Sequence, residues 1–584
     1  MKKYLLIALA ALGFAACADP QDDINNPALG GEVEESFIAI NLMSADVETR
    51  AVTDDPYGDA DKYGYEEGTV AERAIKTAYF FFFDENGNPF NVVGAPATAP
   101  GGSVNHLSLT ISEATTSGMP NVSDIKEAVL VLNTYKGIYP KQIVAVLNWI
   151  PNSDKAYSLQ DLHNSVPITT TIKDNEEDKT YYVMSNSVYM DDAGKVVDAT
   201  PLTAANIKTD ADAAKAAPVE IYVERTAAKV VLTAGGKVAN TENIFDTQKD
   251  SNFVLGSPSA DVYVKLHGWE LYNDYAESYL LKTIDPTWTA GDLGLTWNDI
   301  PYYRSYWAES QSVDPNDAFS WKYTNHTAKG FPTEYGYKVA SAADYADGTY
   351  TYCGENTGSY RTKVILKGQL MQKNGENYDS LELARWYGNE YAGNEALRIA
   401  VANSLKYTLY YKPEPGVENY VSIAPEDLVC VEGTTVDAEA YESYEVVFQL
   451  SDAGEDKTWY QYSSEKGYTI FGNSSVAGDN TAQTNAHLAT VEPALLYANG
   501  QTYYFVDIQH LGAVGKPAEF GVVRNHVYQI DINKIEGYGS PVYIGTSDLE
   551  DPEYPEIEDE ASYVAARINV LSWKVVKQGV NVGQ

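Results

Sequence analysis

Cysteine is nearly absent from this chain, which has three in 584 residues: Cys17, Cys353 and Cys430. Zinc sites and disulfide frameworks are built from closely spaced sets of cysteines, and no CxxC pair is present. Cys17 belongs to the N-terminal signal described below. Spacing alone cannot show whether Cys353 and Cys430 lie close enough to bond, so a disulfide between them stays an open alternative to two separate thiols.

Basic residues are also scarce, with 41 Lys and Arg against 82 Asp and Glu and a formal net charge of −41. A surface of this sign repels phosphate backbones and anionic lipid headgroups. We therefore exclude nucleic acid as a partner. The acidity is typical of a solvent-exposed protein that must stay soluble.

Motifs of common enzymes and metal sites are missing. HExxH and GxSxG do not occur, and the seven histidines are scattered along the chain. The stretch 512–521 lacks the spacing of a phosphate-binding loop and has Pro517 where that loop needs a hydroxyl. We predict no catalytic residue, no cofactor, no metal site and no enzymatic activity.

Long apolar runs are limited to residues 4–16, which follow Lys2 and Lys3. The run is too short for a membrane-spanning helix and is typical of a secretory signal. Ala15 and Ala16 directly before Cys17 resemble a bacterial lipobox, in which the cysteine is lipidated and becomes the new N-terminus. We predict lipidation of Cys17, with ordinary signal cleavage as the alternative.

Helical patterns are few, and the best are residues 380–392 and 395–405. Short apolar strands are numerous, at 37–43, 75–83, 128–132, 142–149, 262–271, 362–370, 407–411, 444–450, 502–509 and 526–532. The 46 tyrosines against 15 phenylalanines suit sheets with one wet face. This pattern predicts an all-β chain of β-sandwiches with long loops and few short helices.

Composition also divides the chain into segments. The small, polar stretch 204–217 predicts the main domain boundary. The expected parts are a signal at 1–17, a segment with one strand at 18–50, an N-terminal sandwich at 51–217, a C-terminal sandwich at 218–546, an acidic linker at 547–561 and C-terminal strands at 562–584.

Arg50 stands alone in an acidic region, as the one basic residue between Lys3 and Lys62. It follows the strand expected at 37–43 and precedes Ala51. This is a target for a trypsin-like protease, which would cut the Arg50–Ala51 bond and release the preceding strand. An ordinary loop arginine is the alternative.

The C-terminus carries a strand pattern with a change of phase. Apolar or small side chains alternate at Val564, Ala566, Ile568 and Val570, and then Leu571, Trp573 and Val575 take over the apolar role. A slip of one residue turns side chains to the other face unless a bulge or bend intervenes. We predict two consecutive strands, joined to the body by the acidic linker.

These features together resemble the fimbrillin family that builds type V pili of Bacteroidales, closest to its minor fimbrillin, a shaft subunit. The resemblance rests on the lipobox at Cys17, on Arg50 before Ala51, on VERTAAKVVL (223–232), on YYVMSNSVYM (181–190) and on GVVRNHVYQIDINKI (521–535) followed by YVAARINVLSWKVV. Within VERTAAKVVL we expect Glu224 and Arg225 to have a structural role at a domain junction.

The resemblance implies two tandem Greek-key or transthyretin-like β-sandwiches and a mechanism of assembly. The precursor would be a lipoprotein of the outer membrane, and an arginine-specific protease would cut after Arg50. The C-terminal strand of another copy would then fill the opened groove and build a head-to-tail homopolymer. Anchor and tip subunits are the other implied partners, and a surface fimbrium serving adhesion and biofilm formation is the implied location and role.

Two other interpretations stay open. The aromatic stretch 288–352 favours an accessory or tip subunit of the same fimbrium. A lipid-anchored, monomeric glycan-binding protein of the cell surface is the alternative from a different class, because tyrosine and tryptophan rings in loops stack on sugars.

Overall fold

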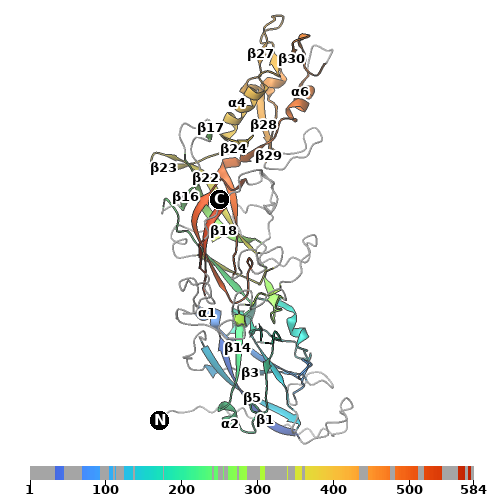
Figure 1. The fold of residues 1–584 in the computed structure, drawn as a ribbon, viewed down its shortest axis with the longest axis vertical. Coiled ribbons are helices and arrows are strands. Elements are labelled where there is room, and N and C mark those ends of the chain that lie inside the picture. Colours follow the sequence, from blue (N-terminus) through green and yellow to red (C-terminus); the bar gives the residue numbers. More distant parts are fainter. Residues whose placement is uncertain are drawn as a thin grey trace.

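The computed structural model describes residues 33–44, 69–92, 104–109, 112–113, 124–135, 139–174, 176–191, 193–239, 243–247, 254–255, 261–272, 275–285, 303–304, 306–309, 338–339, 349–357, 362–432, 445–473, 480–510, 519–541, 563–571 and 577–579. They form an elongated molecule in which sheets follow one another along the long axis (Figure 1). The all-β class predicted from the sequence is confirmed.

A nine-stranded sheet forms one end of the molecule, where β1, β3, β5 and β14 are labelled in Figure 1. In spatial order its strands are β3 His106–Leu109, β2 Ala78–Phe83, β6 Gln142–Leu147, β10 Met184–Asn186, β14 Val219–Arg225, β1 Val33–Ser44, β5 Asp124–Tyr135 and β4 Ser112–Glu113, and β13 Thr200–Pro201 pairs with β6. We call it the N-terminal sheet.

Both faces of this sheet are covered. On β6, Ile143 and Leu147 lie in one apolar cluster, the N-terminal core, whereas Val144 and Val146 lie in a second cluster, the main core. All four side chains are fully buried. This explains why residues 143–147 are apolar without alternation, as a strand buried on both faces requires.

A sandwich of two sheets forms the middle of the molecule, with the main core between them. One sheet has the order β21 Thr349–Cys353, β15 Ala228–Thr233, β34 Val527–Glu536, β36 Tyr563–Leu571 and β37 Lys577–Gly579. The other has the order β16 Ile244–Asp246, β18 Val262–Tyr272, β22 Lys363–Asn374, β33 Gln501–Asp507 and β35 Ser540–Pro541, with β20 Lys338–Val339 on β18 and β23 Asn377–Ser380 on β22.

A further unit, which we call the distal module, is formed by residues 383–500 with the short strand at 254–255, and it lies at the end of the molecule opposite the N-terminal sheet (Figure 1). It has its own apolar core, which includes Trp459 and Phe448. Its larger sheet has the order β17 Val254–Leu255, β25 Asn389–Ala392, β24 Leu383–Trp386, β32 Ala494–Tyr497, β29 Glu445–Leu450 and β28 Leu428–Glu432. Its smaller sheet has the order β27 Val421–Ser422, β26 Tyr410–Tyr411, β30 Trp459–Ser463 and β31 Gly467–Ile470. Its helices are α4 Gly393–Leu405, α5 Asp452–Glu455 and α6 Thr481–Leu488, with short 3₁₀ turns at Pro425–Asp427, Phe471–Asn473 and Ala498–Gly500.

Short elements complete the described chain. They are the hairpin of β8 Thr169–Asp174 and β9 Glu177–Tyr182, the pair β11 Tyr189–Met190 and β12 Val196–Val197, the helices α1 Val70–Arg73 and α2 Ala211–Lys215, and a 3₁₀ turn at Gln160–His163. One more pair, β7 Ser165–Pro167 with β19 Glu277–Tyr279, joins the N-terminal part of the chain to the C-terminal sandwich.

The helix predicted at 380–392 is wrong. Residues 383–386 and 389–392 form a β-hairpin, and Tyr387 and Gly388 make its two-residue turn with φ of 48° and 72°. Positive φ at both turn residues is the geometry that suits the twist of a hairpin, and glycine adopts it without strain. The helix predicted at 395–405 is confirmed as α4.

The chain passes from the N-terminal sheet to the sandwich after β14, not before it. β14 pairs with β10 and β1 of the N-terminal sheet, and β15 begins three residues after Arg225 in the other sheet. The small, polar stretch 204–217 therefore precedes the last strand of the N-terminal sheet.

Candidate functional site

The strand before Arg50 is an interior strand of the N-terminal sheet. β1 pairs in antiparallel fashion with β5 along all twelve of its residues, from Val33 with Tyr135 to Ser44 with Asp124. On its other side it pairs in parallel with β14, where residues 40–44 oppose residues 219–223. We call the space that β1 fills between β14 and β5 the β1 slot.

The β1 slot opens onto the N-terminal core. Ile38 of β1 is fully buried there, together with Leu130 and Leu132 of β5 and Ile221 and Val223 of β14. Neighbouring strands lie about 4.8 Å apart, so β14 and β5 are separated by roughly 10 Å that only a strand can fill. Helix α2 lies against β1 and β5.

The predicted processing residues lie outside the described residues. These are Cys17, Arg50 and Ala51. The described strand ends at Ser44, and Arg50 follows six residues later in the sequence. Cleavage at Arg50 and lipidation of Cys17 thus stay predictions.

The predicted C-terminal donor strand corresponds to β36 as far as Leu571. β36 pairs in antiparallel fashion with β34, where Val564, Ala566, Ile568, Val570 and Leu571 oppose Ile535, Ile532, Ile530, Tyr528 and Val527. Trp573 and Val575 lie outside the described residues. A second strand, β37, follows and pairs back onto β36.

In this single chain β36 is therefore added to the chain's own sandwich. It lies towards the edge of its sheet, with β34 on one side and the three-residue β37 on the other. The second strand predicted from the sequence carried Leu571, Trp573 and Val575, but Leu571 is the last residue of β36, and the second described strand is Lys577–Gly579. Donation of β36 to another copy stays a prediction.

Buried charges connect the N-terminal sheet to the sandwich. Glu224, Lys282 and Arg524 have fully buried side chains; the Lys282 Nζ lies 3.4 Å from Glu224 Oε1, and the Arg524 Nε lies 4.0 Å from it. Arg524 also pairs with Glu355 at 2.6 Å. Burial raises the pKa of Glu224 and lowers the pKa of Lys282, because both charged forms lose water.

The neighbouring residue Arg225 reaches a second set of partners. Its Nε donates to the Glu72 carbonyl at 2.8 Å and its Nη1 to Asn525 Oδ1 at 3.0 Å. Lys229 pairs with the Glu72 carboxylate at 3.0 Å. Glu224 and Arg225 both contact residues of the C-terminal part, but through different partners: Glu224 lies beside Lys282 and Arg524, and Arg225 donates to Asn525.

Glu72 is a residue of this junction that sequence analysis missed. Burial would raise its pKa, but hydrogen bonds from Tyr352 and Lys229 outweigh burial and lower the pKa. A signal was present in the sequence, because Thr69 and Glu72 form the T-x-x-E capping box that starts α1.

The two cysteines lie in different cores. Cys353 is buried in the main core, whereas Cys430 packs against the core of the distal module. Within the part of the chain that the structure describes, their thiols are not joined by a disulfide. Of the two alternatives left open by the sequence, the structure has separate thiols.

The described residues hold no group of three or more His, Cys, Asp or Glu side chains placed to bind a metal ion. Among the same residues, no helix combines the length and the apolar character that crossing a membrane requires.

Comparison with known proteins identifies the C-terminal part of the chain. Residues 495–579 match the family described as "Major fimbrial subunit protein type IV, Fimbrillin, C-terminal". This region includes β33, β34, β36 and β37, and it confirms the resemblance to fimbrillins stated from the sequence. No curated protein matches the chain in sequence.

Several solved structures are similar at low identity. A fimbrilin from Porphyromonas gingivalis is 12% identical, with 94% of this chain and 98% of that chain covered and a TM-score of 0.31. The tip fimbrial protein Mfa3 from the same organism, with a C-terminal truncation, is 11% identical over 92% and 100%, with a TM-score of 0.27. A fimbrial assembly protein from Parabacteroides distasonis is 14% identical over 59% and 85%, also with a TM-score of 0.27.

Proposed function

Proceeding from the fimbrillin C-terminal region that residues 495–579 match, we propose that this chain is a structural subunit of a surface fimbrium. The observation that supports it most is the place of β1 in the N-terminal sheet. A strand that ends six residues before Arg50 lies between two other strands, so that cutting at Arg50 would free an interior strand and not an edge.

Maturation would begin with export as a lipoprotein held at the outer membrane through Cys17. An arginine-specific protease would then cut the Arg50–Ala51 bond, and β1 would be held by non-covalent contacts alone. Its departure would expose the unpaired backbone of β14 and β5 and the apolar floor of the N-terminal core. Such an edge readily takes up a new strand.

The C-terminal strand of another copy would fill the β1 slot. β36 suits this role because it lies towards the edge of its own sheet, so leaving requires breaking its pairs with β34 along one side only, while β37 moves with it. Its alternating sequence supplies an apolar face for the N-terminal core. Each large apolar side chain buried there would contribute about 1.5–3 kcal/mol.

Assembly of this kind would produce a filament. The β1 slot lies at one end of the molecule, and β36 lies on the sandwich in the middle, so donor and acceptor surfaces differ. Heterologous contacts between different surfaces do not close unless the rotation happens to form a ring. Partners would be further copies of the chain, anchor and tip subunits and the protease, in a fimbrium that supports adhesion and biofilm formation.

The experiment that tests this proposal is mass spectrometry of the N-terminus of protein recovered from cell surfaces. We expect a chain that begins at Ala51 and runs as an SDS-resistant ladder. Arg50→Gln should keep a lipidated Cys17 and give no ladder, while the control Lys62→Gln should behave as the unchanged chain. Lipidated Cys17 on all recovered chains would contradict the proposal and favour the lipid-anchored glycan-binding monomer.

A further inference from the structure

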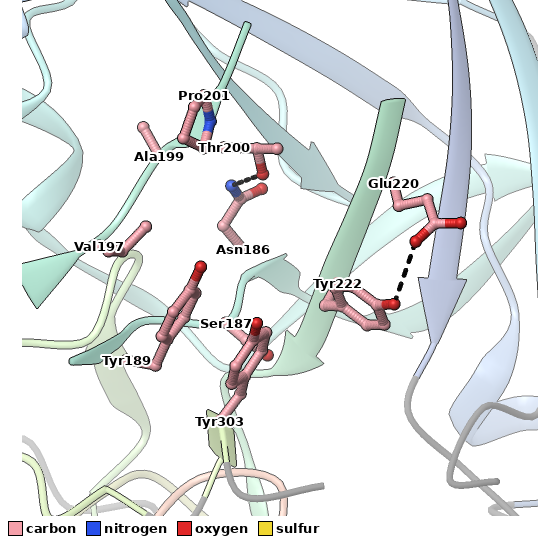
Figure 2. A pocket seen from close by; sticks show the side chains of 10 residues that line it. All are labelled: Asn186, Ser187, Tyr189, Val197, Ala199, Thr200, Pro201, Glu220, Tyr222 and Tyr303. Atoms are coloured by element: carbon pink, nitrogen blue, oxygen red, sulfur yellow. Dashed lines mark hydrogen bonds between the residues drawn. The ribbon is translucent and has the colours of Figure 1, made fainter. Parts of the chain in front are cut away.

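A pocket of about 270 Å³ lies on β14, on the face opposite the N-terminal core (Figure 2). Glu220 and Tyr222 of β14 line it, whereas Val219, Ile221 and Val223 of the same strand face the core. The other walls come from residues 186–201 of the N-terminal part and from Tyr303 of the C-terminal part. We call it the tyrosine pocket.

Three tyrosine rings shape this pocket. Tyr189 and Tyr303 are stacked with their centroids 3.7 Å apart and their planes 3° from parallel. Tyr222 meets Tyr303 at 90° with the centroids 5.7 Å apart. Figure 2 shows the hydroxyl ends of Tyr189 and Tyr303 on the side where Asn186 and Thr200 lie, so the stack turns its polar end towards the pocket.

Some polar groups at the pocket are already satisfied, and others are available. Asn186 accepts from the Ala145 amide at 2.9 Å and donates to Thr200 at 3.2 Å, so its side chain stabilises the fold and is not available to a ligand. The side-chain hydroxyls of Ser187 and Tyr189 have no hydrogen-bond partner within the described part of the chain. Because Ser187 is only 7% exposed and lines the tyrosine pocket, a ligand would reach its hydroxyl through this pocket.

The charge of the pocket restricts its ligand. Glu220 is the one carboxylate among the lining residues, and the lining includes no Lys or Arg, so an anion would be repelled. Burial, with Glu220 nearby, raises the pKa of Tyr222 to about 12, which keeps the phenol neutral and able to donate. Tyr222 donates to Glu220 at 3.4 Å.

Two other ligand classes fit less well. A cation cage needs several ring faces turned to one point, but Tyr189 and Tyr303 turn one face to each other. A wholly apolar ligand would cut the Ser187 and Tyr189 hydroxyls off from water without giving them a partner. A sugar ring has apolar C–H faces for the aromatic rings and hydroxyls that both donate and accept.

We propose that the tyrosine pocket binds a single neutral sugar residue, such as the end of a glycan. The volume suits one ring, since it lies just below the roughly 300–1,000 Å³ of pockets that hold drug-sized ligands. The lining residues all lie outside the segment 18–50, and Glu220 and Tyr222 oppose Asn41 and Met43 of β1, so the proposal is made for the uncut chain, in which β1 is in place.

The test uses the purified full-length chain in saturation-transfer NMR with galactose, glucose, mannose, fucose, N-acetylglucosamine and N-acetylgalactosamine. The strongest binder is then titrated against Ser187→Ala and Tyr189→Phe, which each remove one oxygen atom and leave the ring stack in place. Each should weaken binding about 3- to 10-fold, the effect of one lost neutral hydrogen bond. Tyr462→Phe, on an exposed tyrosine of the distal module, should leave it unchanged.

Three results would overturn the proposal. The first is that none of the six sugars receives saturation, which leaves the pocket without the ligand class assigned to it. Equal affinity in the unchanged chain, Ser187→Ala and Tyr189→Phe would place the sugar elsewhere. Binding of a poly-lysine peptide that is lost in Glu220→Gln, with no sugar bound, would make the pocket a cation site.

Discussion

Ile38 of β1 lies directly opposite Leu130 of β5, and both side chains are completely buried in the N-terminal core. Two segments 92 residues apart in the sequence thus complete one apolar layer. A strand that the proposed processing would remove is, before processing, part of the core that holds the N-terminal sheet together.

The first prediction concerns this contact. Ile38→Ala should lower the free energy of unfolding of the uncut chain by about 2–5 kcal/mol, because it leaves a cavity in a packed core. Urea denaturation measures the change. Val131→Ala on the same strand pair is the control, since Val131 is 46% exposed and should cost less than about 0.5 kcal/mol. Equal effects of the two substitutions would show that β1 does not contribute to the core.

The second prediction concerns release of β36. Gln529 and Asn569 are direct partners across β34 and β36, at a separation that a disulfide spans. The double variant Gln529→Cys/Asn569→Cys should give no SDS-resistant ladder when oxidised and a normal ladder when reduced. Each single cysteine variant should polymerise under both conditions. A full ladder from the oxidised double variant would mean that β36 stays in its own sheet during assembly.

The third prediction concerns the buried charges at the domain junction. Lys282→Met removes the cation nearest to Glu224 and should destabilise the chain by about 3–5 kcal/mol. Adding Glu224→Gln should recover part of that loss, because the buried negative charge is then gone. Lys412→Met is the control: it breaks a pair with Glu418, which is 76% exposed, so the cost should be about 0–1 kcal/mol. Without recovery in the double variant, Lys282 would act through packing alone.

Local patterns in the sequence predicted much of the secondary structure. The segments 37–43 and 142–149 predicted β1 and β6, and the apolar residues 143–147 of the second segment match a strand with a core on each face. The helix predicted at 380–392 is wrong, because residues 383–386 pair with residues 389–392. The positive φ of Tyr387 and Gly388 lets these two residues form the turn of a hairpin.

What the sequence could not supply were contacts between distant segments. Tyr189 and Tyr303 stack although 114 residues separate them, and Glu72 bonds with Lys229 and Tyr352. No periodicity encodes such pairs, because they depend on how the N-terminal sheet and the sandwich meet. The place of β1 inside its sheet likewise depends on which strands pair, and strand patterns alone do not fix that order.

The last prediction concerns the dependence of stability on pH. His526 is fully buried, its Nδ1 lies 2.8 Å from the Arg524 carbonyl, and burial, aided by His510 and by the cations Lys282 and Arg304, holds its pKa well below 6.5. Below pH 6.5 the unfolded chain therefore binds a proton that the folded chain does not. The free energy of unfolding should fall as pH decreases through this window, by up to about 1.4 kcal/mol per pH unit from this group.

His526→Asn removes the proton-binding ring and keeps a donor for the Arg524 carbonyl. Urea denaturation at pH 7.5, 6.5, 5.5 and 5.0 should show a constant offset above pH 6.5 and a shallower decline below it, relative to the unchanged chain. The pKa values of His106, His267 and His487 are also lowered, chiefly by burial, but their contribution is the same in both chains and cancels in the difference. Parallel curves at all four pH values would mean that His526 takes up its proton equally in the folded and unfolded chains, and the buried junction would then have to accommodate one more positive charge beside Arg524.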